Sequence, residues 1–274
     1  MGTVERTVLT TGANTGIGLA TAIELARRGF VSVAGVRSQT KARAVTRAAK
    51  GAGVKVRTVL LDVTNADDCR RVMTVLKPYG LVNNAGVPAS GAIEDVDDED
   101  ARVAMETMVL GPMRLARFAI PHMRSQGGGR IVNISSIYGL MTTPLTGWYQ
   151  ASKHALEALS DALRVELAAD DIAVVLIEPG AFRSNIWESA GNDVQRRVDS
   201  EYFAAYRRLE EGIRVSQRLM GDPIEVARLI ASVMGAKSPK ARYLVGYDAR
   251  AIDIYAKLLP TEVRDRLARI TLGL

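Results

Sequence analysis

The chain has 274 residues and a mass of 29.6 kDa, which is the size of one large α/β domain. Hydrophobic residues make up 47% of the sequence and charged residues 24%, a composition that excludes disordered and fibrous proteins. The net charge is +6, but arginines alternate with acidic residues even in the stretch that looks most basic, residues 191–220. Because this pattern forms no basic stripe, we expect no nucleic-acid partner.

The apolar runs of the sequence are too short for a membrane-spanning helix. The longest wholly apolar run, Ile172 to Ile177, has six residues, whereas a membrane helix needs about 20. The first six residues lack the apolar core of a signal peptide, so we expect a cytoplasmic protein with no membrane partner. Cys69 is the only cysteine, and His122 and His154 are the only histidines, which argues against a disulfide and against a bound metal.

Short runs rich in β-branched residues alternate along the chain with longer segments whose apolar residues recur at helical spacing. The alternation predicts an α/β fold: a single doubly wound domain of the Rossmann type over residues 1–274, with about seven parallel strands and helices on both faces. Helices are expected over Ala20–Arg28, ended by Gly29 in the left-handed conformation, and over about Trp148–Ala169. The expected strands are Thr7–Thr10, Val31–Val36, Lys55–Leu61, Leu81–Asn83, Arg130–Ser135, Ile172–Glu178 and Arg242–Val245.

A glycine-rich segment, TGANTGIG, follows the first expected strand and precedes a helical pattern. Residues with a small side chain or none let the backbone turn sharply and approach a pyrophosphate, whose charge the amides of the following helix N-terminus would bind. An ordinary tight turn is the alternative, but the position between a strand and a helix favours a dinucleotide site. The candidate cofactor-binding residues of this segment are Gly12, Asn14, Thr15, Gly16, Ile17 and Gly18.

Arg37 lies 19 residues beyond Gly18, where the second strand is expected to end. A site specific for NAD usually has Asp or Glu at this place, to bind the ribose hydroxyls, whereas an arginine suits the 2′-phosphate of NADP. The sequence therefore favours NADP(H), with NAD(H) as the alternative cofactor. Because Lys41 and Arg43 make the whole region basic, Arg37 could also be an ordinary surface residue.

Three candidate catalytic residues follow the fifth expected strand: Ser136, Tyr149 and Lys153. Tyr149 and Lys153 are four residues apart and therefore share one face of a helix. Half-ionising a tyrosine at pH 7 requires about 4 kcal/mol, which an ammonium about 4 Å away supplies at an effective dielectric constant of about 20. We therefore expect Lys153 to lower the pKa of Tyr149, so that Tyr149 exchanges a proton with a carbonyl oxygen that Ser136 hydrogen-bonds.

With these motifs the sequence resembles the short-chain dehydrogenase/reductase family, over roughly Thr7 to Ser184. The resemblance implies that Tyr149 and Lys153 also contact the cofactor, with Lys153 on the nicotinamide ribose. It further implies three groups of cofactor contacts, namely Asp62 and Val63 at the adenine, Asn84, Ala85 and Gly86 along the adenosine half, and Pro179, Gly180, Phe182 and Ser184 around the nicotinamide.

The resemblance implies an NADP(H)-dependent oxidoreductase, a ketoreductase that transfers hydride between the nicotinamide and a hydrophobic ketone or secondary alcohol. Residues from about 184 to 222 would form the substrate lid, and residues 242–249 resemble branches that act on steroids, retinoids or similar lipophilic molecules. Many members of the family form homodimers or homotetramers. The residues that suggest an apolar lid are Phe182, Ile186, Trp187, Tyr202, Phe203 and Tyr206.

Two features depart from the family pattern. Met108 lies where members generally have an asparagine that holds a water of the proton relay, and the segment from Asp68 to Asn83 is several residues short. These departures motivate an alternative function, a non-catalytic NAD(P)-binding sensor or partner-binding protein on the same fold. A sugar-nucleotide epimerase or dehydratase shares the Tyr-Lys pair, but it normally needs a larger substrate domain than the residues after Gly180 provide.

Overall fold

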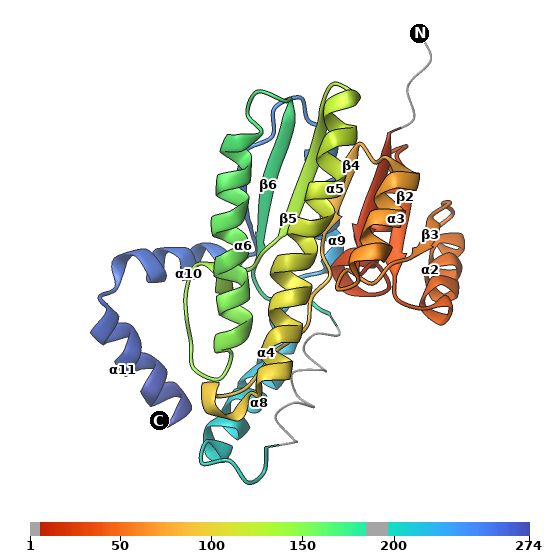
Figure 1. Cartoon of the computed structure of the whole chain (residues 1–274). Helices are drawn as coiled ribbons and strands as arrows, with labels where there is room; N and C mark the ends of the chain where they lie inside the picture. Colours follow the sequence, from red (N-terminus) through yellow and green to blue (C-terminus); the bar gives the residue numbers. More distant parts are fainter. Residues whose placement is uncertain (1–5, 185–196) are drawn as a thin grey trace.

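The computed structural model describes residues 6–184 and 197–274. Within these residues, seven strands form one sheet in the order β3-β2-β1-β4-β5-β6-β7, and every neighbouring pair is parallel (Figure 1). The direction of the crossovers reverses between β1 and β4, as the predicted doubly wound fold requires. The strands are β1 (Thr7–Thr11), β2 (Val31–Val36), β3 (Arg57–Leu60), β4 (Gly80–Asn83), β5 (Gly129–Ile134), β6 (Ile172–Pro179) and β7 (Arg242–Val245).

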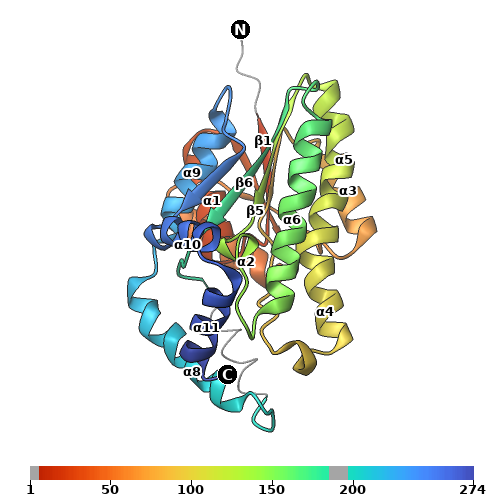
Figure 2. The same ribbon diagram turned by 90° about the vertical axis from the view of Figure 1, so that its left-hand side faces the viewer.

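Helices cover both faces of the sheet, which Figure 2 shows edge-on. One face carries α1 (Gly16–Arg27), α2 (Gln39–Gly51) and α9 (Pro223–Gly235), and the other α3 (Ala66–Leu76), α5 (Gly111–Ser125) and α6 (Gly147–Glu166). A π-helical turn (Glu106–Leu110) joins α4 (Asp98–Met105) to α5, and short 3₁₀ turns occupy Ile93–Asp95, Ile137–Gly139 and Gln217–Leu219. Beyond the carboxyl ends of the strands lie α8 (Phe203–Ser216), α10 (Tyr247–Leu258) and α11 (Thr261–Leu272) (Figures 1 and 2).

Local signals in the sequence explain where several helices begin and end. Gly29 has φ +84° directly after α1, the left-handed conformation predicted for it. The Asn65 side chain accepts hydrogen bonds at 3.0 Å from the amides of Asp67 and Asp68 and so caps α3. The predicted boundaries are wrong by a few residues at the start of α1, which begins at Gly16 and not at Ala20, at both ends of β3, and at the end of α6.

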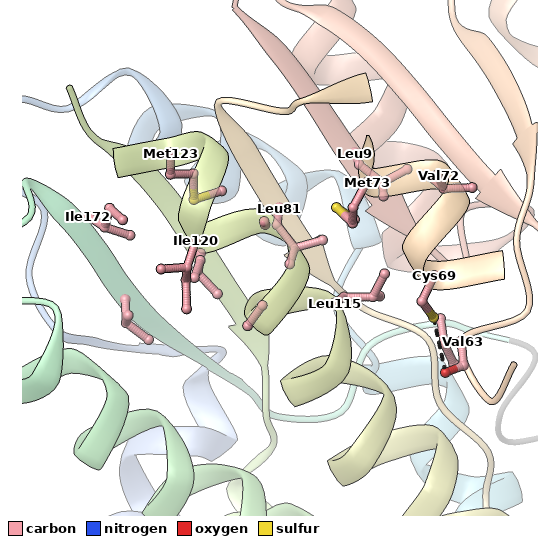
Figure 3. Packing of buried hydrophobic residues seen from close by; sticks show 14 of the residues in the cluster. Leu9, Val63, Cys69, Val72, Met73, Leu81, Leu115, Ile120, Met123 and Ile172 are labelled. Carbon is pink, nitrogen blue, oxygen red and sulfur yellow. Dashed lines mark hydrogen bonds between the residues drawn. The ribbon is translucent and has the colours of Figure 1, made fainter. Parts of the chain in front are cut away.

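The largest core cluster lies between the sheet and the helices α3 and α5 (Figure 3). Leu9 and Leu81 of the sheet face Met73 and Leu115 of these helices, and all four side chains are fully buried. Cys69 belongs to the same cluster, and burial raises the pKa of its thiol to about 11. The thiol is therefore protonated at neutral pH and is a packing residue.

The described residues contain no helix long and apolar enough to cross a membrane. The same part of the chain also holds no group of three or more His, Cys, Asp or Glu that could bind a metal ion.

We expect Leu81→Ala to lower the free energy of unfolding by about 2–5 kcal/mol, because it leaves a cavity at the centre of the sheet. Urea denaturation measures this change. The control is Val75→Ala on α3, where the side chain is 76% exposed and the expected change stays within about 0.5 kcal/mol. Equal small effects of the two substitutions would contradict the position of β4 in the core.

Candidate active site

A cavity of about 800 Å³ opens at the carboxyl edge of the sheet. The site residues predicted from the sequence all line it except Gly16, which lies next to it against Ser184. The predicted site residues that line the cavity are Gly12, Asn14, Thr15, Ile17, Gly18, Arg37, Asp62, Val63, Asn84, Ala85, Gly86, Ser136, Tyr149, Lys153, Pro179, Gly180, Phe182 and Ser184.

The glycine-rich turn is tightly packed against the segment that follows β4. Gly12 has φ +61°, and a Cβ on it would lie 2.8 Å from the Ala85 Cα. The Asn84 side-chain amide donates to the carbonyl oxygens of Thr11 at 3.0 Å and of Gly12 at 3.2 Å. A Cβ on Gly18 would clash with that same amide nitrogen. The glycines are therefore required for the close approach of the turn and the start of α1 to the segment after β4, as well as for the turn itself.

The N-terminus of α1 has the features of a phosphate-binding site. Thr15 is the N-cap residue of α1, and its side chain makes no capping hydrogen bond. The first amides of α1 therefore lack a side-chain partner and lie at the cavity that Thr15 and Ile17 line. The arrangement fits the pyrophosphate of a dinucleotide.

The part of the cavity next to the end of β2 is basic. Arg37 follows β2 and is exposed, and both Arg37 and Lys41 line the cavity. Neither side chain forms an ion pair with any described residue. Asp62 accepts hydrogen bonds from the amide and hydroxyl of Thr64 at 3.0 and 2.8 Å, which fixes the loop after β3. Two uncompensated cations thus lie where the second strand ends.

Ser136, Tyr149 and Lys153 come together from β5 and α6. Ser136 follows β5, is 8% exposed, and accepts a hydrogen bond from the Tyr138 amide at 3.2 Å. The Tyr138 and Tyr149 rings meet edge to face with centroids 6.2 Å apart. Lys153 donates through Nζ to the Ile134 carbonyl at 2.8 Å, with Nζ 5.5 Å from the centre of the Tyr149 ring.

Burial dominates the protonation of this group. It raises the pKa of Tyr149 to about 12, and a hydrogen bond with Ser136 only partly opposes the rise. Burial also lowers the pKa of Lys153 to about 8, against the opposite effect of Glu157. The expectation that Lys153 brings the pKa of Tyr149 towards neutrality is therefore wrong for this structure, because removal of the phenolate from water dominates and Ser136 is the group that opposes the rise.

Asp248 is a residue of the site that the sequence analysis missed. Its carboxylate accepts a hydrogen bond from the Ala181 amide at 2.6 Å, and the neighbouring Gly180 amide donates to the Val245 carbonyl at 2.8 Å. A Cβ on Gly180 would clash with Asp248, so this glycine is required. The carboxylate fixes the segment after β6 at the cavity wall. The signal in the sequence that could have indicated Asp248 is an acidic residue in the first turn of a helix.

Of the described aromatic residues that suggest an apolar lid, Phe182 lines the cavity and the others do not. Tyr202, Phe203 and Tyr206 do not line the cavity, and the prediction for Ile186 and Trp187 falls outside the described residues. Tyr206 is fully buried, donates to Asp95 at 2.6 Å, and accepts from the Ala92 amide at 2.7 Å. Within the described part of the predicted lid segment, the cavity is lined by Arg208, Leu209, Gly212, Ile213 and Ser216 of α8. Ile252 of α10 and Thr271 and Leu272 of α11 line it from outside that segment.

Met108 lies in the π-helical turn between α4 and α5 and is 1% exposed. Its sulfur would be 3.6 Å from a Cβ on Gly86, so the thioether packs against the segment after β4. The neighbouring Thr107 lines the cavity, but Met108 does not.

A family model described as short chain dehydrogenase matches residues 6–195. The chain belongs to the short-chain dehydrogenase/reductase family. It is an oxidoreductase that acts on CH–OH or C=O groups.

Three curated relatives cover most of the chain. The uncharacterized oxidoreductase YusZ of Bacillus subtilis is 34% identical over 265 residues, which are 93% of this chain and 94% of the relative. The 3-ketodihydrosphingosine reductase of Bacteroides thetaiotaomicron is 31% identical over 244 residues, 87% of each chain. Retinol dehydrogenase 5 of Mus musculus is 30% identical over 280 residues, 94% of this chain and 86% of the relative.

Solved structures of the family include complexes with both nicotinamide cofactors. A variant of the actinorhodin polyketide ketoreductase with NADPH has a TM-score of 0.75 and 28% identity, covering 88% of this chain and 95% of that one. A short chain dehydrogenase/reductase from Burkholderia phymatum in complex with NAD has a TM-score of 0.77 and 25% identity, covering 98% and 95%. A nicotinamide dinucleotide is therefore the cofactor type of this fold.

We expect Gly18→Ala to weaken NADPH binding at least about tenfold, because the added methyl displaces Asn84 and with it the turn that approaches the pyrophosphate. Titration of cofactor fluorescence measures the affinity. In the control, Gly51→Ala, no atom lies within 4 Å of the new Cβ, and binding should not change. Wild-type affinity in Gly18→Ala would remove the glycine turn from the cofactor site.

Proposed function

We propose that the protein is an NADP(H)-dependent ketoreductase that transfers hydride between the nicotinamide and a hydrophobic ketone or secondary alcohol. The observation on which this proposal rests is that one cavity is lined by the glycine turn and by Ser136, Tyr149 and Lys153. The raised pKa of Tyr149 favours reduction at neutral pH, because the hydroxyl keeps the proton that a reduced carbonyl needs.

Each of these side chains has a distinct role in the proposed reaction. A bound NADPH would supply the hydride. Tyr149 donates its proton to the oxygen of the carbonyl being reduced. Ser136 accepts a hydrogen bond from the Tyr138 amide and hydrogen-bonds Tyr149, and its hydroxyl would turn to donate to the same carbonyl oxygen once the substrate is bound. Lys153, whose pKa is about 8, is an ammonium at pH 7 and stabilises the phenolate that Tyr149 becomes.

The glycine turn and the N-terminus of α1 would hold the pyrophosphate, and Arg37 with Lys41 would bind the 2′-phosphate. Asp62 and Val63 would contact the adenine, Asn84 would line the adenosine half, and the other residues named for the cofactor keep the roles that the family resemblance implies. Both cations line the cavity and lack an ion-pair partner among the described residues, which supports NADP(H) over NAD(H).

The proposed substrate is hydrophobic. Leu209, Ile213, Ile252 and Leu272 bring apolar side chains to the cavity wall from α8, α10 and α11. Two of the relatives are named for 3-ketodihydrosphingosine and retinol, both lipophilic molecules. We therefore infer a lipophilic carbonyl compound, covered by the lid at about residues 184–222, of which 185–196 lie outside the described residues.

We further propose that the chain works as a single domain, in a homodimer or homotetramer formed through α5 and α6. Of the leucines at helical spacing on α6, Leu156 is 1% exposed and belongs to the core, whereas Leu159 is 40% exposed and available for a contact. The oligomeric state stays a prediction, which sedimentation would measure.

Turnover with a panel of hydrophobic ketones and aldehydes tests the function, with wild type beside Tyr149→Phe. We expect NADPH oxidation by wild type and a loss of at least about a hundredfold in Tyr149→Phe, because the phenylalanine has no proton to donate. Tyr247→Phe is the control, since Tyr247 is fully exposed and should tolerate the change. Cofactor binding without turnover, in both directions, would favour the alternative of a non-catalytic sensor.

The affinity ratio for NADPH over NADH should fall at least about tenfold in Arg37→Asp, because the carboxylate repels the 2′-phosphate and suits the ribose hydroxyls of NAD. Arg43→Asp makes the same charge change at an exposed position of α2 that does not line the cavity, and it should leave the ratio close to that of wild type. An unchanged ratio in Arg37→Asp would exclude this arginine from the site.

The rate of carbonyl reduction should be constant below about pH 7 and fall as the pH rises through about 8. The sign follows because Lys153 loses its charge there, while Tyr149, with a pKa of about 12, keeps its proton. Steady-state rates from pH 6 to 10 measure this dependence, and circular dichroism over the same range shows whether the fold persists. A rate that rises between pH 7 and 9 would contradict these protonation states.

A further inference from the structure

An ionic cluster lies where α6 packs on β6 and on the edge strand β7. Arg242 of β7 donates through Nη1 to Glu157 and, at 2.7 Å, to Glu178, and through Nη2 to Asp161 at 2.6 Å. Glu157 and Glu178 are 7% and 2% exposed, whereas the Asp161 side chain is 42% exposed and also binds Arg164. One arginine therefore holds carboxylates from two elements of the fold.

The cluster brings negative charge close to Lys153. Its three carboxylates form ion pairs with Arg242 and Arg164. Lys153 lies one helical turn before Glu157 on the same face of α6, so its ammonium lies next to a carboxylate of the cluster. Because uncompensated charge is costly away from water, the ammonium and the carboxylates stabilise each other.

One oxygen of Glu157 is not bound by Arg242. Oε2 is bound by Arg242, whereas Oε1 is buried and has no hydrogen-bond partner among the described residues. Burial lowers the pKa of Lys153, and of the charged groups described, Glu157 is the one that raises it.

The other titratable groups at this end of the cavity do not take over this role. Burial raises the pKa values of Tyr138 and Tyr149, so both are neutral at pH 7. Asp248 of α10 is bound by the amides of Ala181 at 2.6 Å and Ala249 at 2.9 Å. The acid that α6 presents next to the lysine is therefore the one that sets its charge.

We propose that Glu157, held in place by Arg242, is a positioning residue that keeps Lys153 in its ammonium form and so sets the upper pH limit of carbonyl reduction. The inference rests on the proposed function, because the charge of Lys153 matters to catalysis only if Tyr149 donates a proton. It assigns a role to an ionic cluster whose residues do not line the cavity.

A titration of Lys153 itself tests the proposal without turnover. The chain has eight lysines, whose ε-carbons are labelled with ¹³C and followed by NMR from pH 6 to 11, and Lys153→Arg identifies the signal. We expect a midpoint of about 8 in wild type and one lower by about one unit or more in Glu157→Gln, a tenfold shift of the protonation equilibrium. An unchanged midpoint in Glu157→Gln would overturn the proposal.

Three further variants separate charge from shape. Glu157→Asp keeps the carboxylate and should retain a midpoint near that of wild type. Asp161→Asn removes an acid of the same cluster two helical turns from Lys153 and should shift the midpoint less than Glu157→Gln does. Arg242→Gln frees the negative charge and should raise the midpoint, so it tests the proposal in the opposite direction if Glu157→Gln does not fold. A midpoint that falls in Arg242→Gln would contradict the proposal.

The pH dependence of reduction distinguishes failure of this inference from failure of the proposed function. We expect the loss of rate at high pH to move downwards in Glu157→Gln together with the NMR midpoint. A wild-type enzyme that reduces ketones, with a pH limit that stays in place in Glu157→Gln, would overturn the role of Glu157 alone. A wild-type protein that reduces nothing, while the NMR midpoint still shifts, would overturn the function and retain the electrostatic role.

Discussion

The transfer of the Lys153 ammonium out of water is the constraint on which the candidate active site depends. The side chain is 6% exposed, and burial lowers its pKa to about 8. The Ile134 carbonyl at the end of β5 accepts a hydrogen bond from the ammonium at 2.8 Å. Glu157, on the next turn of α6, raises the pKa of Lys153 and so opposes the loss of the lysine's proton. Without such partners a buried amine is neutral at physiological pH. The charge that should stabilise the Tyr149 phenolate thus depends on strand, helix and ionic cluster together.

The parallel sheet explains why these groups meet the cofactor site. All seven strands of the described chain run in one direction, so the glycine turn after β1, Ser136 after β5 and Gly180 after β6 reach the same edge. The cavity at this edge is lined both by the N-terminus of α1, whose N-cap side chain makes no capping hydrogen bond, and by Tyr149. Burial of the tyrosine then has a chemical consequence, because a protonated phenol at pH 7 is a proton donor.

Local patterns explain which parts of this arrangement could be predicted from the sequence. The strand, glycine turn and helix around Gly18 follow each other directly, and Tyr149 and Lys153 share a helix face by spacing alone. The pKa of Tyr149 was wrongly predicted, because desolvation depends on everything that packs around the ring. Asp248 was missed since its partner Ala181 is 67 residues away, and Tyr206 was placed in the lid although its partner Asp95 is 111 residues away. Such contacts exist only once the chain is folded.

The ionisation of Tyr149 tests most directly whether burial controls the chemistry of this site. The ultraviolet absorbance of phenolate in wild type, minus that in Tyr149→Phe, isolates this tyrosine from the other seven. With a pKa of about 12, Tyr149 should contribute no phenolate between pH 6 and pH 10. One equivalent of phenolate that appears with a midpoint between pH 7 and 8 would contradict the account, because attraction to Lys153 would then outweigh desolvation.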